Sequence, residues 1–91
     1  MYEIVTTRHF MRRAKKFLRK HPDLRGRFTT LINELSRDPF QPHLKLHALS
    51  GKLEGIFAAG ISHSYRLTLS LQVTEKEIIL LDVGSHDEVY R

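Results

Sequence analysis

The feature that most constrains the fold of this chain is a change in the spacing of its apolar residues. From Phe10 to Leu35, apolar residues recur every three or four positions, which is typical of amphipathic helices. From Ser62 to Leu71, apolar and polar residues alternate one by one, which is typical of a strand with one buried face. The sequence therefore predicts an α+β fold, with helices and strands in separate segments of the chain.

Two helices are predicted in the first half of the chain. The apolar stripe of the first consists of Phe10, Ala14, Phe17 and Leu18, and that of the second of Leu24, Phe28, Leu31, Ile32 and Leu35. Pro22 ends the first helix, because proline disfavours helical geometry in the residue before it, and Asp23 is the expected N-cap of the second. Asp38 and Pro39 end the second helix. We expect the two helices to form a hairpin.

Strands are predicted on both sides of this hairpin. They cover Tyr2–Thr6, Leu53–Ile61, Ser62–Leu71 and Ile78–Leu81, and Asp87–Tyr90 is expected to form a short helical turn. Gly84 is expected to release the chain from the last strand. The predicted order is β-α-α-β-β-β, in which the last three strands form an antiparallel meander. We expect the helical hairpin to cover one face of this antiparallel sheet and the other face to stay open.

Composition limits the classes to which the chain can belong. Its 91 residues, 41% of them hydrophobic, suffice for one domain over residues 1–91 with one modest core. No cysteine is present, which excludes disulfides, thiolate metal sites and a thiol nucleophile. No apolar run approaches the length of a membrane span, and no signal-peptide pattern opens the chain. The expected location is the cytoplasm.

Positive charge is concentrated in residues 1–27, which contain nine of the 15 Lys and Arg residues but only two of the 10 acidic residues. Part of this charge forms a stripe along the first predicted helix, opposite its apolar side: Arg8, Arg12, Lys15, Lys16 and Arg19. Such a stripe indicates a polyanionic partner, either nucleic acid or an acidic protein. A solvated helix face with no partner is the alternative, and charge alone does not decide between them.

The last ten residues combine groups that can carry chemistry. His86 follows the apolar run Ile78–Leu81, and Tyr90 comes four residues later. An imidazole ordinarily titrates near neutrality, so a histidine at the end of a strand can act as an acid or a base. In the alternating strand, Arg66 falls on the face away from the core, whereas Tyr65 and His63 fall on the other.

Three short segments resemble known motifs, and so does the order of the elements. The segments are Leu46–Gly51, with His47 in a His-x-Leu-x-Gly pattern, Ser64–Leu67, and the Gly-Ser-His of Gly84–His86. Together they resemble the RelE/ParE superfamily of toxin–antitoxin toxins, and within it most of all the YafQ-type branch. The resemblance implies a RelE-like fold. It also implies a metal-independent endoribonuclease that needs no cofactor and cleaves mRNA, usually on the ribosome, with a cognate antitoxin as partner.

The resemblance also implies roles for individual residues. His47, Arg66 and His86 match catalytic positions, with His86 as general acid, His47 as base or phosphate contact, and Arg66 stabilising charge on the phosphate. The residues expected to contact RNA are Tyr65, Tyr90, His63, Arg12 and Lys16. Two histidines and one arginine suffice in principle for attack of an RNA 2′-hydroxyl on the adjacent phosphate. The basic stripe would contact ribosomal RNA or an acidic stretch of the antitoxin.

Two other functions remain open. A ParE-like toxin directed at DNA gyrase would share the fold, but such members generally lack the C-terminal histidine that His86 matches. The other is a family member with weakened catalysis that acts as a binding module. It is favoured by Ala58, Gly60 and Ser64, which stand where relatives carry polar side chains.

Overall fold

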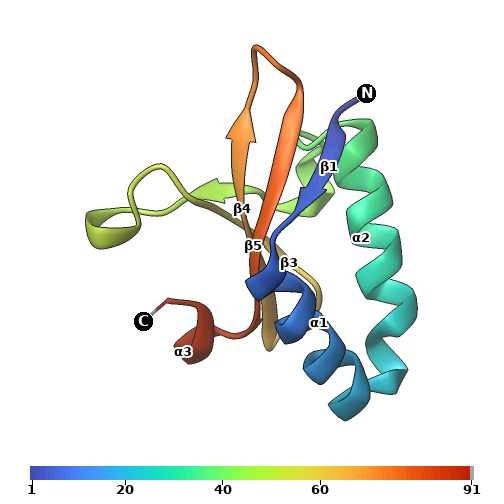
Figure 1. Cartoon of the computed structure of the whole chain (residues 1–91). Coiled ribbons are helices and arrows are strands. Elements are labelled where there is room, and N and C mark those ends of the chain that lie inside the picture. Colours follow the sequence, from blue (N-terminus) through green and yellow to red (C-terminus); the bar gives the residue numbers. More distant parts are fainter. Residues whose placement is uncertain (91) are drawn as a thin grey trace.

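The computed structural model describes residues 1–90 and contains one five-stranded sheet with two long helices (Figure 1). The elements, in chain order, are β1 (Glu3–Thr6), α1 (Arg8–Lys20), α2 (Arg25–Arg37), β2 (His47–Ala48), β3 (Phe57–Gly60), β4 (Tyr65–Gln72), β5 (Glu77–Ser85) and α3 (His86–Val89). Three short 3₁₀ turns lie at Pro22–Leu24, Pro42–Leu44 and Gly51–Leu53. The predicted α+β class and the helical hairpin are confirmed.

The two long helices follow the predicted apolar stripes. Helix α1 begins after Thr7, whose side-chain oxygen accepts a hydrogen bond from the Phe10 backbone N–H at 3.0 Å. It ends at His21, before Pro22, as predicted. The predicted N-cap of α2 is wrong, because Asp23 lies inside a 3₁₀ turn and the helix begins two residues later. None of the helices within residues 1–90 combines the length and apolar character that a bilayer span requires.

The sheet has the strand order β1-β5-β4-β3-β2, so that β5 lies between β1 and β4. Strands β3, β4 and β5 pair antiparallel, as predicted, and the short strand β2 pairs antiparallel with β3. Strand β1 is the exception, because it runs parallel to β5, in register from Glu3 opposite Glu77 to Thr6 opposite Leu80. A parallel pair needs a long crossover connection, and here the chain between β1 and β5 supplies it.

The core lies between the sheet and the helical hairpin. The helices contribute aromatic rings, notably Phe10, Phe17 and Phe28, all at least nine-tenths buried. Strands β4 and β5 contribute aliphatic side chains that are essentially inaccessible: Leu67, Leu69, Ile78, Leu80 and Val83. The alternation predicted for β4 therefore holds for Leu67 and Leu69.

The strands on the far side of the sheet differ from the prediction. Strand β3 begins only at Phe57, because the 3₁₀ turn at Gly51–Leu53 and Gly55, with a φ of +91°, break the extended run predicted from Leu53. The two-residue strand β2 was not predicted. Its His47 lies opposite Ala58 of β3.

The end of β5 also differs from the prediction. Gly84 does not release the chain from the sheet, because β5 continues to Ser85 and Gly84 lies opposite Arg66 of β4. A bulge interrupts this ladder: Thr68 lies opposite Asp82, but Leu69 lies opposite Leu80.

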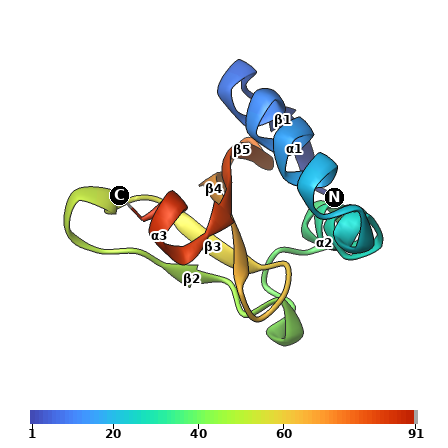
Figure 2. The same cartoon turned by 90° about the horizontal axis from the view of Figure 1, so that it is seen from below.

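The second face of the sheet is not fully open. Helix α3 packs against β4 and β5, and it lies on the side of the sheet away from α2 (Figure 2). Ala58 is 0% exposed and Thr68, which alternates with core residues of β4, is 3% exposed. The expected open face is therefore restricted to the part that α3 leaves uncovered.

Candidate functional site

Two hollows flank the beginning of β4, one on each side of the sheet. The first, called the histidine cleft below, has a volume of about 510 Å³ and lies at the β2 edge. Its lining consists of His43, Leu44, Lys45, His47, Gly60, Ser62, His63 and Arg66. It therefore brings together two of the three predicted catalytic residues, His47 and Arg66, with His63, which was predicted to contact RNA. The predicted placement of His63 on the Tyr65 face is wrong, because β4 begins only at Tyr65 and not at Ser62, so His63 precedes the strand and its alternation.

His47 is placed in the cleft by the short strand β2. Its ring is exposed, and Nδ1 lies 3.1 Å from the backbone oxygen of Lys45. A carbonyl oxygen can only accept, so this hydrogen bond assigns the ring hydrogen to Nδ1 of the neutral imidazole. Nε2 then carries a free lone pair, which is the arrangement that a general base needs. Lys45 itself adopts a φ of +53°, which turns the chain into β2.

Arg66 enters the cleft from β4. Gly60 lies opposite it on β3, and an added Cβ at Gly60 would lie 3.4 Å from an Arg66 guanidinium nitrogen. Glycine at this position thus leaves room for the arginine to lie across the neighbouring strand. Within residues 1–90, the Arg66 guanidinium forms no ion pair, whereas His43 on the cleft's rim pairs with Glu34. The free guanidinium suits a phosphate oxygen.

His86, the third predicted catalytic residue, does not line the histidine cleft as it is described for residues 1–90. It is the first residue of α3, two positions after Gly84, the register partner of Arg66. Its exposed ring packs edge-on against Tyr90, with ring centres 4.2 Å apart. Nδ1 of His86 also lies 3.6 Å from a carboxylate oxygen of Asp87.

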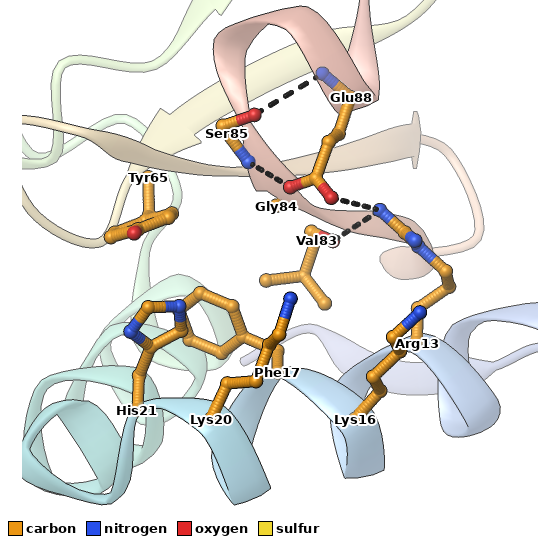
Figure 3. Close-up of a pocket in the computed structure, with 10 residues that line it drawn as sticks. All are labelled: Arg13, Lys16, Phe17, Lys20, His21, Tyr65, Val83, Gly84, Ser85 and Glu88. Carbon is orange, nitrogen blue, oxygen red and sulfur yellow. Dashed lines mark hydrogen bonds and ion pairs between the residues drawn. The ribbon is translucent and has the colours of Figure 1, made fainter.

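The second hollow, called the basic pocket below, has a volume of about 410 Å³ and lies between α1 and the end of β5 (Figure 3). Its lining consists of Arg13, Lys16, Phe17, Lys20, His21, Tyr65, Val83, Gly84, Ser85 and Glu88. Tyr65 and Lys16, both predicted to contact RNA, therefore lie together. They lie on the opposite side of the sheet from Arg66, since successive residues of a strand face opposite ways.

Aromatic rings form one end of the basic pocket. The half-buried Tyr65 ring meets Phe17 edge-on, with centres 5.2 Å apart, and its centre lies 4.5 Å from that of His21. Arg12, also predicted to contact RNA, is exposed on α1 and lines neither hollow.

The Arg13 side chain connects α1 to the end of β5 and to α3 (Figure 3). Its Nε donates to Asp82 Oδ1 at 2.8 Å, its Nη2 donates to the Val83 carbonyl at 3.2 Å, and Nη2 lies 3.8 Å from Glu88 Oε2. Strand β1 ends opposite Leu80, so no strand covers this edge of β5 and Arg13 satisfies the free carbonyl. We call Arg13, Asp82 and Glu88 the Arg13 network.

Glu88 closes the network by capping α3. Its carboxylate accepts the Ser85 backbone N–H at 2.8 Å, while the Ser85 hydroxyl accepts the Glu88 N–H at 3.3 Å, which is a capping box. The hydrogen bond from the Ser85 backbone, with further contributions from the Ser85 hydroxyl, Arg13 and Lys20, lowers the pKa of Glu88 below its ordinary value. A Cβ on Gly84 would lie 2.7 Å from Glu88 Oε1 and 2.9 Å from Arg13 Nη2, so a side chain at this position would displace the ends of the Glu88 and Arg13 side chains from this arrangement.

Solved structures with the same architecture come from several bacteria. YafQ from Escherichia coli BL21(DE3) is 18% identical, with both chains fully covered and a TM-score of 0.83. A copper-bound variant of a toxin from Helicobacter pylori is 27% identical, over 98% of this chain and 99% of that one, with a TM-score of 0.80. The chain has the fold of the RelE/ParE superfamily of toxins. No protein-family model and no curated protein matches it.

One further RelE/ParE-type structure was solved with its partner. The E. coli DinJ–YafQ complex is 18% identical over the full length of both chains, with a TM-score of 0.81. At this sequence identity the similarity establishes the fold alone. The roles of the residues in the two hollows therefore follow from their own chemistry.

Within this RelE/ParE-type fold, most residues of the basic pocket were not predicted from the sequence. The missed residues are Arg13, Lys20, His21, Ser85 and Glu88. Four α1 residues of the pocket and His21, the C-cap of α1, are spaced at 13, 16, 17, 20 and 21, which is one face of a helix, so periodicity alone could have grouped them. Nothing in the spacing indicates that this face meets the end of β5, roughly 70 residues later.

Proposed function

We propose that the chain is the toxin of a type II toxin–antitoxin system, and that it acts as a metal-independent endoribonuclease on mRNA, at the ribosome. The observation that carries the ribonuclease part is the histidine cleft, where His47, His63 and the unpaired Arg66 line one hollow of the described chain. The toxin role is supported by the toxins that share the fold, and an antitoxin partner by the DinJ–YafQ complex.

The proposed reaction needs three groups. His47 Nε2 takes the proton of an RNA 2′-hydroxyl, and the 2′-oxygen then attacks the adjacent phosphorus. Arg66 stabilises the negative charge that develops on the phosphate oxygens. The bond to the 5′-oxygen breaks, and an acid donates a proton to that oxygen. The products are a 2′,3′-cyclic phosphate and a 5′-hydroxyl.

Two histidines are candidates for the acid. His86 is the one that the family resemblance implies, and it lies at the start of α3. His63 lines the histidine cleft itself, beside Arg66. In the proposal His86 acts as the acid, His63 and Tyr90 contact the RNA, and Arg12 lies on the outer basic face of α1, where it would contact ribosomal RNA.

The experiment that tests this proposal uses purified protein and a short synthetic RNA labelled at its 5′ end, in buffer with EDTA. We expect cleavage that leaves a 2′,3′-cyclic phosphate, and no cleavage at a position where the 2′-hydroxyl is replaced by hydrogen. His47→Ala should lose at least about a hundredfold in rate, the usual contribution of a general base. Cleavage at the 2′-deoxy position, or full activity in His47→Ala, would overturn the mechanism.

A second comparison identifies the acid. If His86 is the acid, an RNA with a 5′-thio leaving group, which needs no protonation, should restore the rate of His86→Ala to near that of the wild type. His63→Ala serves as the matched variant, and it should show no such rescue. Rescue of His63→Ala alone would transfer the acid role to His63.

A further inference from the structure

The basic pocket contains two lysines with no acidic partner. Lys16 and Lys20 lie one helical turn apart on α1, and neither forms an ion pair with any residue of the described chain. Arg13 is already paired with Asp82 at 2.8 Å. The positive charge that is free to meet a ligand is therefore the pair of ammonium groups on the α1 side of the pocket.

Part of the pocket is apolar, although Arg13, His21, Ser85 and Glu88 also line it. Phe17 and Val83 are at least nine-tenths buried, and Tyr65 is half-buried with one side facing the hollow. Figure 3 shows Lys16, Lys20 and His21 rising from α1 toward β5, with Phe17 and Tyr65 at one end of the space. A ligand seated here would bury an apolar group against these side chains and place negative charge beside the lysines.

We propose that the basic pocket binds an acidic segment of a partner protein, with carboxylates on Lys16 and Lys20 and a neighbouring apolar side chain against Phe17, Tyr65 and Val83. In identifying that partner with the antitoxin, the inference rests on the proposed function. The spacing fits: Lys16 and Lys20 are about 6 Å apart along the helix axis, and alternate residues of an extended peptide repeat at about 6.8 Å.

A carboxylate is already stabilised at the rim of this pocket. Glu88 lies opposite α1, where the Ser85 backbone N–H, and to a smaller extent Arg13 and Lys20, lower the pKa of its side chain. Lys20, which forms no ion pair of its own within residues 1–90, would likewise favour a carboxylate of a bound segment.

The position of Glu88 also favours a peptide over RNA. A nucleic acid strand carries a charge at every nucleotide, so phosphates would face the Glu88 carboxylate across the pocket. A peptide can place acidic residues on the lysine side and a neutral residue beside Glu88. RNA has its own proposed site in the histidine cleft, on the other side of β4.

The test is a binding measurement by fluorescence anisotropy on the whole chain at physiological salt. The probe is a labelled synthetic peptide in which three glutamates alternate with two leucines. A second peptide replaces the leucines with serine at equal charge, and labelled hexauridylate is the RNA probe. The variant Lys16→Glu/Lys20→Glu removes the pocket charge. Its matched control, Lys15→Glu/Arg19→Glu, makes the same charge change at the same spacing on the same helix outside the pocket, and circular dichroism verifies that both fold.

We expect the leucine peptide to bind the wild type, and the Lys16→Glu/Lys20→Glu variant to bind it at least about tenfold more weakly. The control should lose less than about threefold, and the serine peptide should bind more weakly than the leucine peptide. No binding by the wild type, equal losses in both variants, or a pocket-dependent preference for hexauridylate would overturn the proposal, the last assigning the pocket to RNA. No step involves RNA cleavage, so the failure of the ribonuclease proposal and of this one can be told apart.

Discussion

Replacement of Arg13 by methionine tests whether the Arg13 network attaches α3 and the end of β5 to α1. Methionine retains most of the aliphatic stem but removes the hydrogen bonds to Asp82 at 2.8 Å and to the Val83 carbonyl at 3.2 Å. The Arg13 and Asp82 side chains are only 26% and 22% exposed, so water replaces these bonds incompletely.

The magnitude follows from these contacts. A hydrogen bond to a charged partner contributes about 1.5–3 kcal/mol, and partial exposure brings the Asp82 contact toward the lower end. Asp82 retains its bond from the Val83 N–H at 2.8 Å, so its carboxylate is not left without a partner. We therefore expect Arg13→Met to lower the free energy of unfolding by about 2 kcal/mol, which for a domain of this size is about 8–16 °C in Tm.

Urea denaturation followed by circular dichroism measures this difference. Arg12→Met is the matched control, because Arg12 is the neighbouring exposed residue, and its effect should stay within about 0.5 kcal/mol. A double-mutant cycle with Asp82→Asn should return a coupling energy of about 1 kcal/mol or more. An Arg13→Met protein as stable as Arg12→Met, or a coupling near zero, would refute the network's role.

Three further outcomes are expected. Gly84→Ala should lower Tm, because the added Cβ would lie 2.7 Å from Glu88 Oε1 and 2.9 Å from Arg13 Nη2. Gly26→Ala in α2 should raise Tm, because no atom lies within 4 Å of its added Cβ, and equal effects of the two substitutions in differential scanning calorimetry would contradict the close approach at Gly84. Glu88 has a lowered pKa in the folded chain, so its contribution to stability is present above its unfolded pKa and is lost as the pH falls through its lower folded pKa. In urea titrations, the difference in the free energy of unfolding between wild type and Glu88→Gln should therefore shrink as the pH falls below the ordinary pKa of a glutamate, and a difference that does not change would count against the capping role. Leu67→Ala, at a 0% exposed core position, should lower the free energy of unfolding by about 2–5 kcal/mol, and a loss under 1 kcal/mol would mean that the β4 face is not the core.

The helices could be predicted from the sequence, because each buries one continuous stripe that local spacing reveals. Phe10, Ala14 and Phe17 of α1 are the buried residues that the pattern indicates. Strand β4 was predictable for the same reason, since Leu67 and Leu69 alternate with polar residues. The Asp23 cap was not, because the Pro22–Leu24 turn delays the start of α2.

Other features depend on contacts between distant segments. Strand β2 is two residues long, which is too short to show an alternation of apolar and polar residues. It forms only because it can pair with β3 beside it. The sequence predicts that Gly84 releases the chain from the last strand. In the fold its missing side chain makes room for Arg13, 71 positions earlier, and for Glu88.

Some properties of the candidate site were predictable from local sequence, and others depend on contacts between distant segments. The motifs predicted His47 and Arg66, and the fold places both in the histidine cleft with His63. The Gly-Ser-His motif predicted His86. Its position relative to the histidine cleft depends on how α3 packs against β4 and β5, which the motif does not reveal. The alternation of the strand also predicted that Tyr65 and Arg66 face opposite sides of the sheet, and they line different hollows.

The central claim, that this RelE/ParE-type fold carries an RNA-cleaving toxin, is tested most directly by induced expression in a bacterial host with mapping of mRNA 5′ ends. The wild type should arrest growth and create new mRNA ends bearing 5′-hydroxyls, and His47→Ala, expressed at the same level, should do neither. Growth arrest with intact mRNA and broken DNA would indicate a gyrase-directed toxin instead. Continued growth with intact mRNA would indicate a binding module, and either result would contradict the account.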